Sequence, residues 1–171
     1  MSPIDIRRSV RKYNDKVIDK GTLIKLCEAG FLAPSSRNQD SRAFIIIDDE
    51  KIISLLSTIS MSAKVLENAK CAIAVIGINS DKVPTPRMMD QDLAASTQNI
   101  LLKATELNIG SCWIGVHPIE ERSNLAKEIL NVKGNDYVFS IIALGYIDDD
   151  SIFYRRQDKI KYDHIYANGM K

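Results

Sequence analysis

The chain has 171 residues, of which 45% are hydrophobic and 26% charged, and its formal net charge at pH 7 is +1. This composition is typical of a soluble globular protein, and the small net charge argues against nucleic acid or a membrane surface as the main partner. No apolar run approaches the length of a membrane span, and the first residues do not resemble a signal peptide. We therefore expect a single domain over residues 1–171, located in the cytoplasm.

Cysteine and histidine usage argues against disulfides and against a metal site. The three cysteines are odd in number and lie in apolar segments, which favours reduced core residues. The two histidines, His117 and His164, are far apart and lack a carboxylate-rich pattern around them. No local motif supports a nucleophile. We expect no catalytic side chain and no metal, and we expect a bound cofactor to carry any chemistry.

The N-terminal segment combines a short predicted helix within residues 1–8 with a cationic run, Arg7-Arg8-Ser9-Val10-Arg11-Lys12-Tyr13. Such a run is more often a solvated surface. Guanidinium groups, however, bind phosphate oxygens in a bidentate way, and a serine hydroxyl adds a donor. On these residues alone we favour the solvated surface, with an anion site as the alternative.

Residues 19–32 are predicted to form a helix capped by Asp19 and ended by Ala33-Pro34. Eight polar residues, 35–42, then precede an apolar strand at 44–47. Ser, Asn and Asp are typical of an exposed turn. The length of the polar stretch also suits a cradle of donors for a polyol or a phosphate.

The middle of the chain predicts a helix at 50–60, a short helix at 62–68 and a strand at 71–77. The strand is continuously apolar, so we expect it in the centre of a sheet with both faces covered. A proline-containing loop over 78–89 is expected to form a mobile rim over a pocket.

A helix over residues 92–107 is apolar around most of its girth, so we expect it in the middle of the domain. Asp90 or Asp92 is the expected cap. The short apolar strand at 111–116 contains Gly115, and a glycine there lets a flat ligand approach the main chain closely.

The rest of the chain predicts a helix at 118–131, a strand at 137–144 and a polar, extended tail from about 147. The tail carries Arg155-Arg156, which fits either a solvated end or a second cationic arm for a phosphate. This order of elements predicts a sandwich with helices on both faces of a sheet. No Gly-x-Gly-x-x-Gly follows a first strand, as a classical dinucleotide fold would require.

Four separated segments together resemble the FMN-dependent nitroreductase family. They are Arg7–Arg11, Ala33–Asn38, Asp92–Gly115 with Gln98-Asn99, and Ala143–Tyr146 with Arg155-Arg156. Their order and spacing cover almost the whole chain. The resemblance implies an α+β fold, namely an α/β/α sandwich with a central mixed sheet. It also implies a homodimer with two FMN sites at the subunit interface.

The resemblance implies a set of FMN contacts, and it makes the first cationic run a phosphate site. The residues implied for the phosphate and ribityl chain are Arg7, Arg8 and Ser9, completed by Arg155 or Arg156. Arg11 would reach the N1/O2 edge of the flavin. The residues implied along the ring, with a backbone N–H near N5, are Ile114, Gly115 and Val116. Those implied from the partner subunit are Pro34, Ser35, Ser36 and Asn38.

Two places depart from the family pattern or stay open within it. Where the family usually has Gln-Pro-Trp, this chain has Asp40-Ser41-Arg42, which makes Arg42 a candidate for a further phosphate contact. The polar contact to the pyrimidine edge is expected within 61–68, with Lys64 as the candidate.

The resemblance implies an NAD(P)H oxidoreductase. NADH or NADPH would deliver hydride to flavin N5 and leave, and a nitroaromatic, a quinone or a similar electron-poor acceptor would then be reduced at the same site. Arg11 would offset the negative charge that develops at the N1/O2 edge. The alternatives are a non-enzymatic FMN-storage protein and a fold relative with other flavin chemistry.

Overall fold

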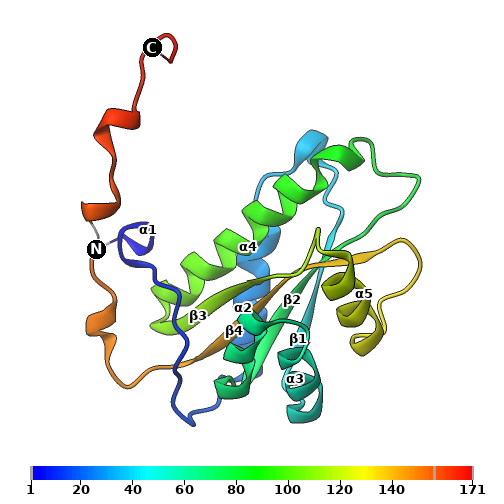
Figure 1. The fold of residues 1–171 in the computed structure, drawn as a ribbon, viewed down its shortest axis with the longest axis horizontal. Coiled ribbons are helices and arrows are strands. Elements are labelled where there is room, and N and C mark those ends of the chain that lie inside the picture. The colour runs from blue at the N-terminus through cyan, green and yellow to red at the C-terminus, as the bar shows by residue number, and fades with distance from the viewer. Residues whose placement is uncertain (1, 156, 171) are drawn as a thin grey trace.

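A four-stranded sheet in the order β1-β2-β4-β3 carries the fold (Figure 1). The strands are β1 (Arg42–Ile47), β2 (Cys71–Gly77), β3 (Ile109–Gly115) and β4 (Tyr137–Tyr146). This computed structural model describes residues 2–155 and 157–170. All three ladders are antiparallel, which differs from the expected mixed sheet. A parallel pairing occurs at an isolated bridge between Ser9 and Ser111.

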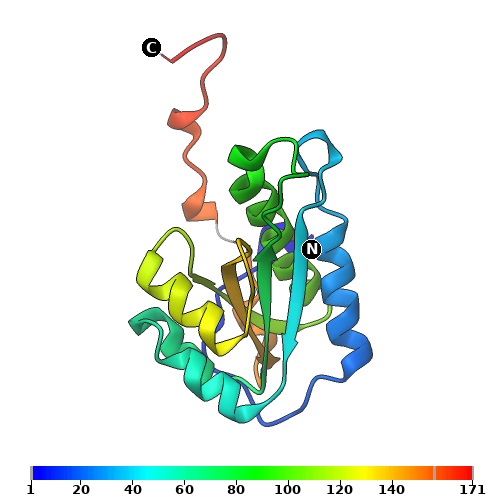
Figure 2. The ribbon, with the colours of Figure 1, turned by 90° about the vertical axis from the view of Figure 1, so that its right-hand side faces the viewer.

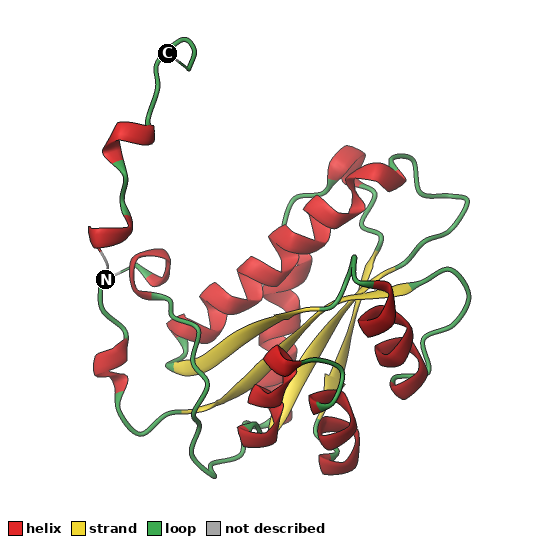
Figure 3. Cartoon of the chain, in the orientation of Figure 1, coloured by secondary structure: helices red, strands yellow, loops and turns green. Residues whose placement is uncertain are grey.

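Helices cover both faces of the sheet (Figures 2 and 3), which confirms the predicted α+β sandwich. One face is covered by α2 (Lys20–Phe31) and α4 (Met89–Glu106). The other is covered by α3 (Glu50–Ser57), α5 (Glu120–Ile129) and a 3₁₀ helix, Met61–Asn68. A single turn, α1 (Pro3–Ile6), packs beside α4. No helix in the described part of the chain is long and apolar enough to cross a membrane.

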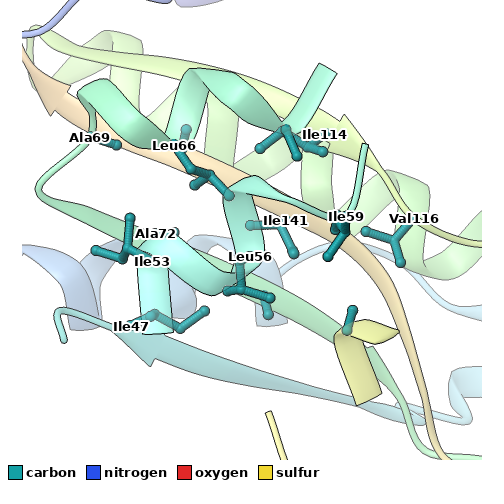
Figure 4. Close-up of a cluster of buried hydrophobic side chains, with 14 of the residues drawn as sticks. Ile47, Ile53, Leu56, Ile59, Leu66, Ala69, Ala72, Ile114, Val116 and Ile141 are labelled. Carbon is teal, nitrogen blue, oxygen red and sulfur yellow. The ribbon is translucent and has the colours of Figure 1, made fainter. Parts of the chain in front are cut away.

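The apolar side chains form one core layer on each face of the sheet. Every residue of β2 is buried, which confirms the prediction that this strand is central. Figure 4 shows the layer beneath α3 and α5, where Leu56, Leu66 and Ile141 meet. Ile114 and Val116 also point into this layer. Side chains alternate between the two faces of a strand, so residues two apart point to the same face. Ile114 and Val116 therefore both place their side chains in the core.

The predicted cap residue is correct for one helix and wrong for another. Asp19 caps α2 as predicted, accepting a hydrogen bond from the backbone N–H of Thr22 at 2.9 Å. The predicted Asp90 or Asp92 cap of α4 is wrong, because this helix begins at Met89 and its cap residue, Met88, makes no side-chain cap bond. Both aspartates lie in the first turn instead, where their carboxylates bind groups from other segments.

The N-terminal segment 7–14 runs beside β3 and across β4. The backbone N–H of Val10 donates to the Ser111 carbonyl at 2.9 Å. The Tyr13 hydroxyl donates to the Val10 carbonyl at 2.7 Å. The Tyr13 ring lies directly over Gly145, where a Cβ atom would come within 2.6 Å of Tyr13 Cβ and Cγ. Glycine at position 145 is thus what lets the segment lie flat on the sheet.

The chain beyond β4 continues as short 3₁₀ turns separated by extended stretches, and residues 157–170 are exposed. Figures 1 and 2 show this tail leading away from the sandwich. Its described part carries several exposed apolar side chains, including Tyr162, Ile165 and Met170.

Two strand glycines make a matched pair for testing this packing. G145A should lower the free energy of unfolding by about 1–3 kcal/mol, because the new methyl group displaces Tyr13. G115A should leave it nearly unchanged, because a Cβ there meets nothing within 4 Å. Denaturant titration of the ligand-free proteins measures both values. Equal stability of the two variants would contradict the described contact between Tyr13 and Gly145.

Candidate functional site

The outer edge of β3 is open beyond the point where the N-terminal segment pairs with it. The backbone groups of Ser111 face that segment. Alternation along a strand directs the backbone groups of Trp113 and Gly115 to the same edge. In agreement, Arg122 donates to the Gly115 carbonyl at 3.3 Å. Gly115 is exposed, so its backbone N–H at this edge can be offered to a ligand.

A cavity of about 390 Å³ lies beside this edge. It is lined by Arg11, Met61, Ser62, Lys64, Val65, Glu67, Asn68, Cys112 and Trp113. The structure therefore brings Arg11 and the candidate Lys64 to one cavity although they are far apart in the sequence. Asn68 and Cys112 also line it and were not singled out from the sequence.

A second cavity, of about 530 Å³, lies between the N-terminal segment and the start of the tail. Its lining residues are Arg8, Ser9, Val10, Arg11, Lys12, Tyr13, Ile147, Asp148, Asp149, Ile152 and Tyr154. Arg11 and Trp113 flank the open edge, and Arg11 borders both cavities. Arg11 thus contributes to the lining of both cavities.

The cations at this site are available to an anion. In the described ranges 2–155 and 157–170, no carboxylate forms an ion pair with Arg7, Arg11 or Lys64. Arg11 donates to the Ser9 carbonyl at 3.3 Å, a neutral acceptor that leaves its charge uncompensated. An anionic group placed here would meet unneutralised positive charge.

Arg8 is engaged with the tail. Its guanidinium donates to the Arg7 carbonyl at 2.8 Å and to the Tyr154 carbonyl, and it lies 4.5 Å from the centroid of the Tyr154 ring. This cation–π contact and these bonds leave the Arg8 Nε buried without a hydrogen-bond partner within the described residues, and the role of Arg8 at a phosphate stays a prediction. Arg155 pairs with Asp5 of α1 at 3.5 Å. Arg156 lies outside the described residues.

The polar loop after α2 is fixed to the start of α4. Asp92 accepts hydrogen bonds from the Ser36 backbone N–H at 2.9 Å and from Gln39 Nε2 at 2.6 Å. Asn38 adopts a positive φ of 52°. Pro34, Ser35, Ser36 and Asn38 line neither of the two cavities. Within one protomer, they are therefore not brought together with Arg11.

Arg42 is a buried structural residue, so the suggested phosphate contact is wrong. Its side chain donates to Ser96 Oγ at 2.7 Å and to Asp40 Oδ1 at 2.5 Å, and only 4% of the residue is exposed. The hydrogen bonds from Arg42 and then Ser35 hold the pKa of Asp40 below its ordinary value. Arg42 is thus held by Asp40, in the loop before β1, and by Ser96 of α4, while its Nε is buried without a hydrogen-bond partner within the described residues.

A polar cluster just past Gly115 was not found from the sequence. Tyr137 OH donates to Asp90 Oδ1 at 2.8 Å, and His117 Nε2 lies 3.3 Å from Asp90 Oδ2. The His117 and Tyr137 rings are 4.6 Å apart. These residues come from three separate elements. The sequence signal available was a histidine two positions after the glycine that ends β3.

Taken together, the α+β sandwich, the cationic segment and the open strand edge define a class of protein that binds an anionic ligand with a planar part. Comparison with known proteins gives the family. A model described as the Nitroreductase family matches residues 4–78 and 60–146. The chain belongs to the nitroreductase family, which confirms the resemblance drawn from its four motifs.

Individual relatives agree with this assignment. The chain is 38% identical to a "Putative NADH dehydrogenase/NAD(P)H nitroreductase" of Archaeoglobus fulgidus, over 94% of this chain and 92% of the relative. A "Putative NADH Oxidase" structure from Clostridium acetobutylicum matches with a TM-score of 0.92 and 34% identity, covering 98% of this chain and 99% of that one. An "FMN-dependent Nitroreductase" of Clostridium difficile R20291 matches with a TM-score of 0.88 and 31% identity, covering 99% of both chains.

The contact between Arg8 and Tyr154 can be tested without any ligand. R8A should free the start of the tail, because it removes both the carbonyl bond and the contact with the ring. Limited trypsin digestion should then cleave after Arg155 about threefold faster, since cleavage follows local opening. K12A, an exposed substitution in the same segment, is the control. Equal cleavage rates in R8A and K12A would show that Arg8 does not hold the tail.

Proposed function

We propose that this protein is an FMN-dependent NAD(P)H oxidoreductase that reduces nitroaromatics, quinones or similar electron-poor acceptors. The observation that carries the proposal is the open edge of β3, with Gly115 uncovered, beside a cavity lined by Arg11 and Lys64. The names of the relatives support it, since they include NAD(P)H nitroreductase and FMN-dependent nitroreductase. We take residues 1–171 as one FMN-binding domain.

The donor set fits FMN. A phosphate requires cations and a hydroxyl. Arg7 and Ser9 would supply them at the N-terminal segment, and Arg155 of the tail would exchange its ion pair with Asp5 for the phosphate. The pyrimidine edge of a flavin presents acceptors, which suits Arg11 and Lys64. Ile114 and Val116 would take part only through their backbones, because their side chains are in the core.

The uncovered strand edge supplies the third part of the site. The backbone N–H of Gly115 would donate toward flavin N5, since it points to the free edge of the strand and the residue is exposed. Pro34, Ser35, Ser36 and Asn38 of the partner subunit would line the other side of the ring. Their absence from the cavities of their own protomer supports this division between subunits.

When bound, FMN supplies the hydride chemistry between a reduced nicotinamide and the acceptor. The role of the chain would be to bind FMN and to tune its reduction potential. Arg11 would place positive charge beside the N1/O2 edge and offset the negative charge that develops there. Because donor and acceptor would use the same open face in turn, the turnover would be ping-pong.

A homodimer completes the proposal. Ile4 and Leu32 are 71% and 83% exposed, and they line a groove of about 520 Å³ between α1, α2 and α4. Apolar side chains exposed around one groove are typical of a surface that a partner covers. The three cysteines are free thiols, which supports a reducing compartment such as the cytoplasm.

The proposal predicts the behaviour of the purified protein with FMN. It should be yellow, have the mass of a dimer, and lose its absorbance at about 450 nm when NADH or NADPH is added without oxygen. A nitroaromatic or a quinone should restore the band. A colourless monomer that takes up no FMN would contradict the proposal. A yellow protein that neither nicotinamide bleaches would be an FMN-storage protein instead.

Replacement of Arg11 tests its electrostatic role. R11A should lower the reduction potential of the bound flavin and slow reduction by NADH about tenfold, equivalent to about 1.4 kcal/mol, because a positive charge beside the ring is lost. Potentiometric titration and stopped-flow absorbance measure the two effects. K133A, which removes an exposed cation elsewhere, is the control. An unchanged potential in R11A would remove Arg11 from the mechanism.

A further inference from the structure

The cluster of Asp90, His117 and Tyr137 is an organised polar group outside the binding site described above. Asp90 contributes both carboxylate oxygens, one to the Tyr137 hydroxyl at 2.8 Å and one to His117 Nε2 at 3.3 Å. The side chain of His117 is 31% exposed. An imidazole held on one nitrogen and partly open to solvent can exchange a proton with a small molecule.

The position of His117 relates this cluster to the site. His117 follows Gly115 by two residues, and its backbone N–H donates to the Phe139 carbonyl at 3.0 Å. The histidine is therefore fixed to β4 directly after the open edge of β3. In the described part of the chain, no hydrogen bond is recorded on its Nδ1.

The groups that face His117 come from three elements. Asp90 approaches from α4 and Tyr137 from β4, while Arg122 of α5 donates to the nearby Gly115 carbonyl at 3.3 Å. Burial, and then the hydrogen bond to Asp90, raise the pKa of Tyr137 above its ordinary value. Tyr137 therefore stays a protonated donor, and Asp90 is held by it on one side while facing the imidazole on the other.

We propose that His117 donates a proton to the acceptor as the acceptor is reduced, and that Asp90 is its positioning residue. This inference rests on the proposed function. Reduction of a quinone to a hydroquinone requires two electrons and two protons. A hydride, derived from the reduced nicotinamide, carries both electrons and one proton. His117 supplies the second proton to a carbonyl oxygen, is left neutral, and regains a proton from water.

An acceptor that takes up electrons without a proton distinguishes proton donation by His117 from a purely structural role of this residue. Ferricyanide takes up a single electron and no proton, whereas a benzoquinone takes up hydride and a proton. Loss of a proton donor should therefore slow reoxidation of the reduced protein by the quinone and leave reoxidation by ferricyanide unchanged. A variant with a distorted site should be slowed with both.

The test compares H117Q with H164Q, which alters the other histidine of the chain, in anaerobic stopped-flow absorbance. In H117Q, reduction by NADH should stay within about twofold of wild type. Reoxidation by benzoquinone should fall at least about tenfold. Reoxidation by ferricyanide should not change. H164Q should behave as wild type with both acceptors.

The contrary outcomes are distinct. An unchanged quinone rate in H117Q, or equal slowing with quinone and ferricyanide, would overturn the role of His117 while leaving the proposed function in place. Failure of both NADH and NADPH to reduce the wild-type protein would overturn the proposed function, and this inference with it.

A second variant and a measurement without turnover guard against a folding defect in H117Q. D90N keeps His117 and should slow reoxidation by the quinone about threefold, with ferricyanide unaffected. In the oxidised wild-type protein, phenol serves as a probe for the hydroquinone. Phenol should shift the imidazole NMR signals of His117. The H164Q variant, which lacks the other histidine, identifies the signals that belong to His117. An unshifted His117 signal at saturating phenol, or an unchanged quinone rate in D90N, would overturn the proposal.

Discussion

The packing of the N-terminal segment against two glycines determines the geometry of the whole site. Tyr13 covers Gly145, and Val10 approaches Gly110 so closely that a Cβ there would lie 2.9 Å from Val10 Cγ1. A side chain at either position would lift the segment from the sheet. With both glycines present, the segment bonds to Ser111 of β3, and Arg11 reaches the cavity beside the open part of that strand.

Strand β3 serves the core and the site at once because its backbone and side chains alternate. The backbone groups of Ile114 belong to the ladder with β4, and its side chain is buried in the layer shown in Figure 4. The backbone groups of Gly115 face the opposite edge, where Arg122 donates to the Gly115 carbonyl and the residue is exposed. A rigid, buried strand thus presents N–H donors at fixed positions, and preorganised donors of this kind are well suited to hold and tune a planar cofactor.

The elements were predictable because their signals are local, whereas several side-chain roles were not. The continuous apolar run of β2 and the Asp19 cap need only neighbouring residues. Arg42, by contrast, donates to Ser96, 54 residues away, so its burial arises only from the tertiary fold. The contact of Arg8 with Tyr154 was likewise not predictable, because Tyr154 lies at the other end of the chain. The contacts implied for the partner subunit remain predictions.

Amide hydrogen exchange tests the central claim, that the open edge of β3 holds the flavin, most directly. Saturating FMN should slow exchange of the Gly115 amide at least about tenfold, since a donor exposed at the edge gains an acceptor. The Ile114 amide, already bonded within the ladder to β4, should exchange slowly with and without FMN. Unchanged exchange at Gly115 in the presence of bound FMN would contradict the account.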